Sequence, residues 1–289
     1  MENSELPDEI KLWADFEREL IYTNRFFPNV EILSKIEGIA RMFADTITEG
    51  CVLFRAREYE EVDYILFSDE FDDQEEASEE SDKRKRDLYY SVLIKAARGK
   101  DSDYLSGRVF SEIVNEKKNS SIWGYSEKES GKPNREKAGL NRASPKYIAY
   151  LYLAGDVDTA LAEARAQVNQ PFSIAEYKIA KSLKIVNLSF SHVDCENNGA
   201  TMEEVMLYAF IHRAFSSPSN SSDRDYLVSQ YIAEYIKKLG YDGIVFDSSR
   251  NLGGINYTLF DDSAFEFLGS AIHEVASIKV ASRRLLPPE

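Results

Sequence analysis

The chain is poor in the residues that build disulfide frameworks and metal centres. Its 289 residues include two distant cysteines, Cys51 and Cys195, and three isolated histidines, His192, His212 and His273. Two distant thiols do not form a disulfide framework, and their scarcity favours a reducing cytoplasm. The histidines lack the spacing of zinc ligands. We therefore expect no metal, and we assign none of the histidines to catalysis.

Long hydrophobic runs are also missing. No apolar stretch approaches the roughly 20 residues that span a bilayer. Residues 1–5 lack the basic region and the apolar core of a secretory signal peptide. With 43% apolar residues and 12% aromatic residues, the sequence predicts a globular, cytoplasmic protein that does not enter a membrane.

Positive charge is in deficit. The chain has 35 basic and 50 acidic residues, a formal net charge of −15. A broad basic face that could follow a nucleic-acid backbone is therefore not expected. A small anionic ligand remains possible, because a single pocket can be locally positive on an acidic protein.

The first fifty residues predict a helical extension of two helices. Apolar residues recur at helical spacing after Pro7, and a second stripe ends at Gly50. The two stripes are Ile10, Trp13, Phe16 and Leu20, and then Ile32, Ile36, Ile39, Phe43 and Ile47. We interpret both stripes as packing surfaces.

Residues 51–289 are predicted to form a second domain, which begins with a strand over residues 51–57. Arg55 and Arg57 share one face of this strand because side chains alternate. They are either solvated edge residues or buried charges that need partners. Residues 68–87 form an insertion, first strongly acidic and then basic at residues 83–86. Such runs are usually mobile surface loops; a docking segment or a nucleic-acid mimic is the alternative.

The C-terminal half alternates predicted strands with helices. The strands are expected at residues 172–179, 183–188, 243–247 and 256–260, and the helices from Thr201 and over residues 226–239. A polar loop, residues 248–254, lies between the last two of these strands. This half of the chain is therefore expected to contain both strands and helices.

Chemistry-bearing residues gather where these elements begin or end. Arg142 lies in a loop, Tyr152 in a short strand, Glu163 in the helix that follows, and Ser248 in the polar loop. Each has an ordinary structural explanation: a surface charge, a core tyrosine, a solvated acid and a turn residue. None of these residues, taken alone, indicates a specific function.

Together these residues resemble the RES domain family, named for its arginine, glutamate and serine. The family's central motif is Gly-Arg-x-Asn-Pro, then an apolar-Tyr-apolar-Ala strand, then Thr-Ala-x-x-Glu. The matching segments are residues 141–145 (Asn-Arg-Ala-Ser-Pro), 151–154 (Leu-Tyr-Leu-Ala) and 159–163 (Thr-Ala-Leu-Ala-Glu). An arginine strand at residues 53–57 and a serine strand and loop at residues 241–260 complete the resemblance. Asn141 and Ser144 depart from the family's glycine and asparagine.

The resemblance implies an α+β fold with an ADP-ribosyltransferase-like core: a mixed, mostly antiparallel sheet with flanking helices, here preceded by two N-terminal helices. It also implies an activity on NAD. Characterised members are mostly toxins of bacterial toxin–antitoxin pairs, which degrade NAD by hydrolysis or phosphorolysis. Some members transfer ADP-ribose to a protein. NAD as substrate and a neutralising antitoxin as partner are therefore the expected ligands.

The same resemblance suggests roles for the individual residues. Arg142 and Arg55 are expected to bind the pyrophosphate, since guanidinium groups match phosphate oxygens bidentately; Arg57 is the alternative to Arg55. Tyr152 is expected beside the nicotinamide ribose. Glu163 is expected to stabilise positive charge on that ribose, as carboxylates do in glycosidases. Ser248 and Asn256 are expected to hydrogen-bond the nicotinamide amide or the ribose. A non-catalytic interaction protein that uses its acidic segment is the alternative from another class.

Overall fold

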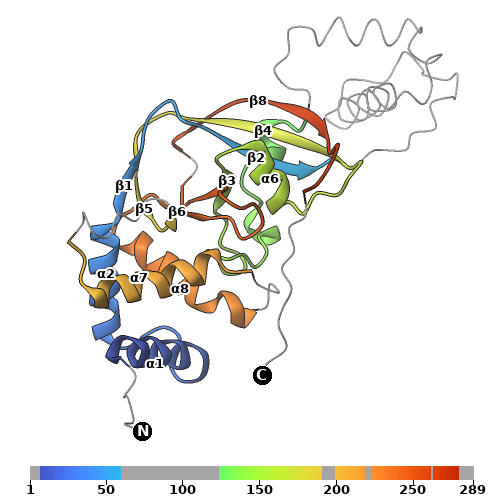
Figure 1. The fold of residues 1–289 in the computed structure, drawn as a ribbon. Helices are drawn as coiled ribbons and strands as arrows, with labels where there is room; N and C mark the ends of the chain where they lie inside the picture. The colour runs from blue at the N-terminus through green and yellow to red at the C-terminus, as the bar shows by residue number, and fades with distance from the viewer. Residues whose placement is uncertain (1–6, 60–123, 191–198, 219–222, 262, 280–289) are drawn as a thin grey trace, which may run out of the picture.

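The structure is a computed structural model, and it describes residues 7–59, 124–190, 199–218, 223–261 and 263–279. Its centre is an eight-stranded sheet flanked by helices (Figure 1). This arrangement confirms the predicted α+β fold with two helices ahead of the sheet. The acidic segment, Cys195 and His192 lie outside the described residues.

The sheet is mixed but mostly antiparallel. Its strand order is β1-β5-β6-β7-β3-β2-β4-β8, and the β5–β6 pair is the parallel one among the described strands. The strands are β1 (Ala44–Ile47), β2 (Val52–Glu58), β3 (Leu151–Ala154), β4 (Pro171–Ile179), β5 (Leu183–Asn187), β6 (Gly243–Asp247), β7 (Ile255–Leu259) and β8 (Phe265–Glu274). Sequence analysis did not predict β1 or β8.

The second N-terminal helix ends earlier than predicted. Helix α1 spans Asp8–Tyr22 and α2 spans Val30–Met42. The apolar stripe runs on to Ile47, but residues 44–47 form β1, which pairs antiparallel with β5. The expected helix through residue 47 was therefore wrong. A strand gains its hydrogen bonds from a distant partner, which local periodicity does not reveal.

The remaining helices follow the local signals more closely. Thr201 and Glu204 form a capping box at the start of α7 (Met202–Ser216), as the sequence predicts. Helix α8 spans Asp223–Lys238. Between β3 and β4 lies α6 (Val157–Glu163), with Asp156 as its N-cap. Two short elements, α5 (Glu127–Ser130) and a 3-10 turn (Arg135–Lys137), precede β3.

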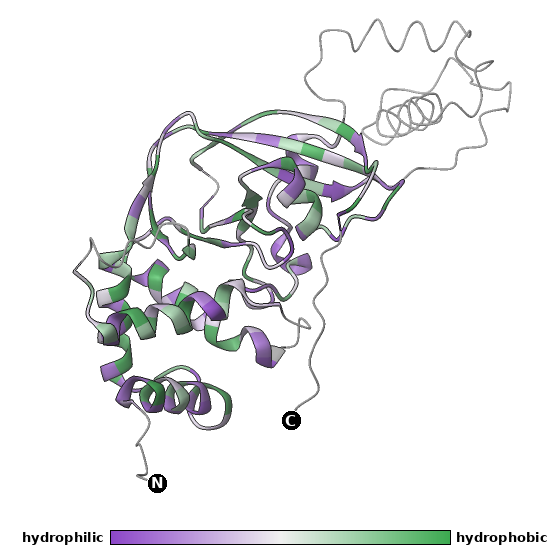
Figure 2. Cartoon of the chain, viewed as in Figure 1, coloured by the Kyte–Doolittle hydropathy of each residue, from purple (hydrophilic) through white to green (hydrophobic). Residues whose placement is uncertain are grey.

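One buried cluster joins the N-terminal helices to the rest of the protein. Helices α1, α2, α7 and α8 lie together on one side of the sheet (Figure 1), and each carries both apolar and polar residues (Figure 2). The cluster includes Trp13, Phe16, Leu20, Ile32, Ile36, Ile39, Leu207, Tyr208, Ile211, Phe215, Ile232, Ile236 and Ile244. The core thus crosses the domain boundary predicted at residue 50, which remains a prediction.

The sheet opens between β2 and β3. These strands share a single registered pair, Phe54 with Ala154, whereas β3 pairs with β7 along its whole length and β2 with β4 likewise. Beyond Phe54 the strand β2 therefore continues without β3 beside it. Residues of both strands line the cavity described below. In the described part of the chain, no helix is both long enough and apolar enough to cross a membrane.

Two buried tyrosines allow a test of how hydrogen bonding of a buried hydroxyl affects the stability of the protein. The hydroxyl of Tyr177 is buried without a hydrogen-bond partner, whereas that of Tyr150 donates to Glu234. We expect Tyr177→Phe to raise the free energy of unfolding by about 1 kcal/mol, because it removes an unsatisfied buried group. Tyr150→Phe is expected to lower it by about 1–3 kcal/mol. Urea unfolding of both variants measures the difference, and equal losses would contradict it.

Candidate functional site

The floor of the cavity is a row of residues that lie opposite one another on adjacent strands. Phe246 on β6 faces Asn256 on β7, Asn256 faces Ala154 on β3, and Ala154 faces Phe54 on β2. Directly opposed residues present their side chains to the same face of a sheet. All four line one cavity of about 500 Å³. This volume lies within the range of roughly 300–1,000 Å³ that small-molecule sites occupy.

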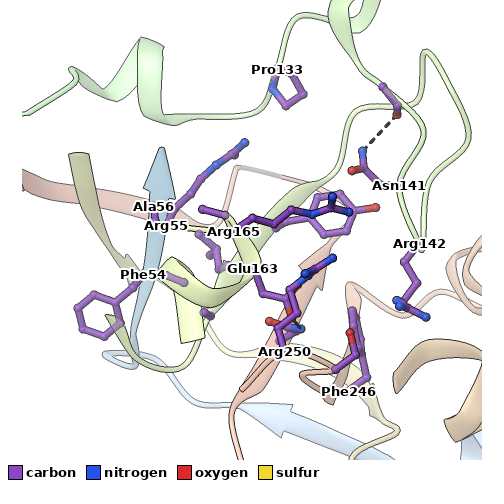
Figure 3. A pocket seen from close by; sticks show the side chains of 18 of the residues that line it. Phe54, Arg55, Ala56, Pro133, Asn141, Arg142, Glu163, Arg165, Phe246 and Arg250 are labelled. Atoms are coloured by element: carbon purple, nitrogen blue, oxygen red, sulfur yellow. Dashed lines mark hydrogen bonds and ion pairs between the residues drawn. The ribbon is translucent and has the colours of Figure 1, made fainter. Parts of the chain in front are cut away.

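The cavity is positively charged although the protein is acidic. Five cationic side chains line it, whereas Glu163 is the one carboxylate among its described lining residues. The cations are Arg55, Lys137, Arg142, Arg165 and Arg250. Figure 3 shows several of these side chains around the same space. On a chain with a net charge of −15, such a concentration favours an anionic ligand.

Glu163 is held from two sides by the sheet and the polar loop. The hydroxyl of Ser248 and the amide Nδ2 of Asn256 both donate to its Oε1, each at 2.7 Å. Its other oxygen, Oε2, lies 3.8 Å from Nε of Arg250. Glu163 is the last residue of α6. The structure therefore brings together three predicted site residues at one carboxylate.

The polar loop is organised around Ser248. Its Oγ accepts hydrogen bonds from the backbone amides of Arg250 and Asn251, at 3.1 and 3.0 Å. The Asn251 side chain donates to Thr159 Oγ1 at 2.8 Å, and Thr159 also bonds to the N-cap residue Asp156. These bonds join the loop to the first turn of α6. The hydroxyl of Ser248 thus both fixes the loop and orients Glu163.

Arg142 is tied to the C-terminal end of α7. Its two terminal nitrogens donate to the backbone carbonyls of Ala214 and Ser217, at 3.0 and 2.6 Å. Burial lowers the pKa of Arg142, and nearby Arg250 lowers it further, while Tyr226 and Glu163 act in the opposite direction. Since a guanidinium has five N–H donors, others can still serve a ligand in the cavity.

Tyr152 lines the cavity and anchors the loop that carries Arg142. Its hydroxyl shares a 2.8 Å hydrogen bond with Ser144 Oγ. Burial raises the pKa of Tyr152, although bonds to Ser144 and Ala143 act against this shift. The phenol is therefore neutral at physiological pH. Tyr152 contributes its ring to the cavity wall, while its hydroxyl is engaged in the structure of the loop.

The structure distinguishes between the two arginines of β2. Arg55 lines the cavity and donates to the carbonyl of Gly131 at 2.8 Å. Arg57 is not among the described residues that line the cavity. Burial lowers the pKa of Arg55 to about 10, and the neighbouring Arg57 adds to this effect. Arg55 still carries its charge at neutral pH and faces the cavity from the side opposite Arg142 (Figure 3).

Sequence analysis missed three of the cationic side chains: Lys137, Arg165 and Arg250. Arg165 follows Glu163 by two residues and has a positive φ of 58°, which turns the chain after α6. Arg250 follows Ser248 by two residues in the polar loop. Their proximity to predicted site residues was the available signal. Among the described residues, no group of three or more histidine, cysteine or acidic side chains could hold a metal ion.

The family model for the RES domain matches residues 115–281, which is more than half of the chain. The chain belongs to the RES domain family. Arg142, Tyr152, Glu163, Ser248 and Asn256 all lie within the matched residues. The match therefore covers the carboxylate, the residues that hold it and the loop that carries the central arginine of this RES domain.

Comparison with solved structures identifies a toxin–antitoxin complex of M. tuberculosis, MbcT–MbcA. The match covers 85% of this chain and 93% of that chain, with 9% sequence identity and a TM-score of 0.39. No curated protein matches the sequence.

Both residues that depart from the RES motif have defined surroundings in this structure. Asn141 does not have a positive φ, so this position does not require glycine. Its carbonyl accepts from Gln230 Nε2 at 2.7 Å. Ser144 is fully buried and reaches Tyr152. Gln230 and the buried Ser229, which bonds to the carbonyl of Arg142, fasten the loop to α8.

Proposed function

We propose that this RES domain cleaves the nicotinamide–ribose bond of NAD, as a glycohydrolase or phosphorylase, and acts as a bacterial toxin. One observation carries the proposal. The carboxylate of Glu163 is fixed by Ser248 and Asn256 in a cavity whose other charged lining residues, in the part of the chain that the structure describes, are cationic. NAD offers the matching pattern: an anionic pyrophosphate, and a ribose that becomes positive as its bond to nicotinamide breaks.

Cleavage passes through an oxocarbenium-like transition state, and nicotinamide leaves as a neutral molecule. Protonation of the leaving group is therefore unnecessary, and catalysis consists of positioning and electrostatic stabilisation. Glu163 is suited to this task because its carboxylate is oriented before the substrate arrives. Its interaction with the ribose becomes stronger as positive charge develops, so it contributes most in the transition state.

The cationic side chains are suited to the pyrophosphate. Burial lowers the pKa of both Arg55 and Arg142, which means that each guanidinium lacks part of its solvation. An anionic ligand would compensate for that loss and would be bound through charge-assisted hydrogen bonds. We therefore assign Arg142 and Arg55 to the pyrophosphate, and the ring of Tyr152 to the nicotinamide ribose.

A neutralising antitoxin and a cytoplasmic location are part of the same proposal and follow from the family. Transfer of ADP-ribose to a protein would use the same carboxylate with a different acceptor. The alternative of a non-catalytic interaction protein rests on the acidic segment, residues 69–82, which lies outside the described residues.

The decisive experiment is to incubate the purified protein with NAD, with and without phosphate, and to separate the products by chromatography. We expect nicotinamide release that Glu163→Ala lacks. Free ADP-ribose identifies water as the acceptor, ADP-ribose 1-phosphate identifies phosphate, and labelled protein identifies a transferase. Intact NAD under every condition would overturn the proposal.

The two arginines of β2 supply a matched comparison. We expect Arg55→Gln to weaken ADP-ribose binding by about 10-fold or more, the effect of losing one charge-assisted hydrogen bond. Arg57→Gln is expected to change it by less than about 3-fold, since Arg57 acts only through longer-range electrostatics. Isothermal titration calorimetry measures both. The assignment would be reversed if Arg57→Gln had the larger effect.

A further inference from the structure

Arg250 occupies an unfavourable place for the reaction just proposed. Its Nε lies 3.8 Å from Oε2 of Glu163, the carboxylate oxygen that Ser248 and Asn256 do not use. Both side chains are about one-third exposed, at 35% and 33%. A cation at this distance partly cancels the negative charge that would stabilise an oxocarbenium ion. Full catalytic effect of Glu163 therefore requires that Arg250 be drawn away.

The side chain of Arg250 can move toward a second arginine, Arg142. Arg142 and Arg250 line the same cavity and are close enough that Arg250 lowers the pKa of Arg142. Two guanidinium groups that repel each other across a cavity form a site for an anion shared between them. Arg142 is fixed by the carbonyls of Ala214 and Ser217, so Arg250 is the partner that can adjust.

The loop lets the side chain of Arg250 move while its backbone stays in place. The amide of Arg250 donates to Ser248 Oγ, and Ser248 N donates to the carbonyl of Gly254 at 2.8 Å, which closes the loop. Gly254 packs so tightly that a Cβ there would lie 2.3 Å from Thr159 Oγ1. The guanidinium is held near Glu163 by a long, partly exposed ion pair, and such pairs are weak.

We propose that Arg250 is a specificity-determining residue that makes cleavage depend on phosphate groups in the substrate. In the free protein it pairs with Glu163. The substrate's pyrophosphate draws its guanidinium toward Arg142 and releases Glu163 for the ribose. A nucleoside without phosphate leaves the Arg250–Glu163 pair in place and reacts slowly. This inference rests on the proposed NAD cleavage.

The test compares NAD with nicotinamide riboside, which carries the same scissile bond but no phosphate. We expect Arg250→Gln to lower kcat/KM for NAD at least 10-fold, mainly through KM, and to raise kcat/KM for nicotinamide riboside several-fold. Arg250→Lys keeps the charge and should restore part of the preference for NAD. Arg18→Gln is the matched control, because Arg18 pairs with Asp15 on α1; it should leave both substrates unchanged.

The outcomes separate this inference from the function on which it rests. A wild-type protein that cleaves NAD, combined with an Arg250→Gln variant that shows no gain on nicotinamide riboside, overturns the role of Arg250 alone. A wild-type protein that leaves NAD intact overturns both. Thermal unfolding of Arg250→Gln, with a midpoint close to that of the wild type, confirms that the variant is folded.

Discussion

Replacing Glu163 by glutamine is expected to lower kcat for NAD cleavage by about 10²–10³-fold, the typical effect of removing one preorganised electrostatic group from an active site. The affinity for ADP-ribose should stay within about 3-fold, because the charge of Glu163 acts mainly on the transition state. Nicotinamide release and titration calorimetry with ADP-ribose measure the two quantities separately.

The geometry around Glu163 allows this variant to remove the charge while keeping the shape and the hydrogen bonds of the side chain. Glutamine has the shape of glutamate and keeps an oxygen that can accept from Ser248 Oγ and Asn256 Nδ2, the two groups now 2.7 Å from Oε1. The loop and α6 should therefore keep their positions. Unchanged thermal unfolding is the control. Turnover that survives with weakened binding would show that Glu163 holds the substrate instead of stabilising charge.

Deleting residues 1–43 is expected to prevent the rest of the chain from folding into a stable monomer. The deletion removes α1 and α2, whose buried side chains pack against α7 and α8 in one cluster. Apolar faces of α7 and α8 would then be exposed to water, and exposed patches of this kind promote association. Size-exclusion chromatography and circular dichroism of the truncated protein measure the outcome.

Point substitutions on α2 refine the same test. Ile36 is 1% exposed and Val30 is 77% exposed on one helix. We expect Ile36→Ala to lower the free energy of unfolding by about 2–5 kcal/mol. Val30→Ala should change it by less than about 0.5 kcal/mol. A truncated protein that stays folded and active would instead establish residues 1–50 as a separable extension, as the sequence suggests.

Local signals in the sequence were sufficient for much of the fold. Helix α7 begins at its predicted capping box, Thr201 with Glu204, because a cap is made by residues three positions apart. Strand β2 (Val52–Glu58) lies where a strand is expected, over residues 51–57. The apolar stripe through Ile47 was misleading, since Phe43 and Ile47 are both buried, but Phe43 is the C-cap of α2 and Ile47 lies in β1. Burial alone does not distinguish a helix from a strand that follows it.

For the candidate site, too, the sequence predicted one part and the tertiary structure decided the other. Motif spacing identified Arg142, Tyr152, Glu163, Ser248 and Asn256, because the residues of a family motif are recognisable in the chain itself. The contacts of Glu163 with Ser248 and Asn256 span 85 and 93 residues, and strand pairing creates them. The choice of Arg55 over Arg57 as a cavity residue likewise depends on where β2 separates from β3.

The amino-acid sequence was enough to predict the family and the residues of its motif, since these depend on short spacings along the chain, and the resemblance to the family then implied the α+β class. The tertiary structure was needed to place Arg250 beside Glu163 and to tie Arg142 to the end of α7. It was also needed to join the N-terminal helices to the common core. These features arise from contacts between distant segments, and the strength of an electrostatic interaction depends on distance in space.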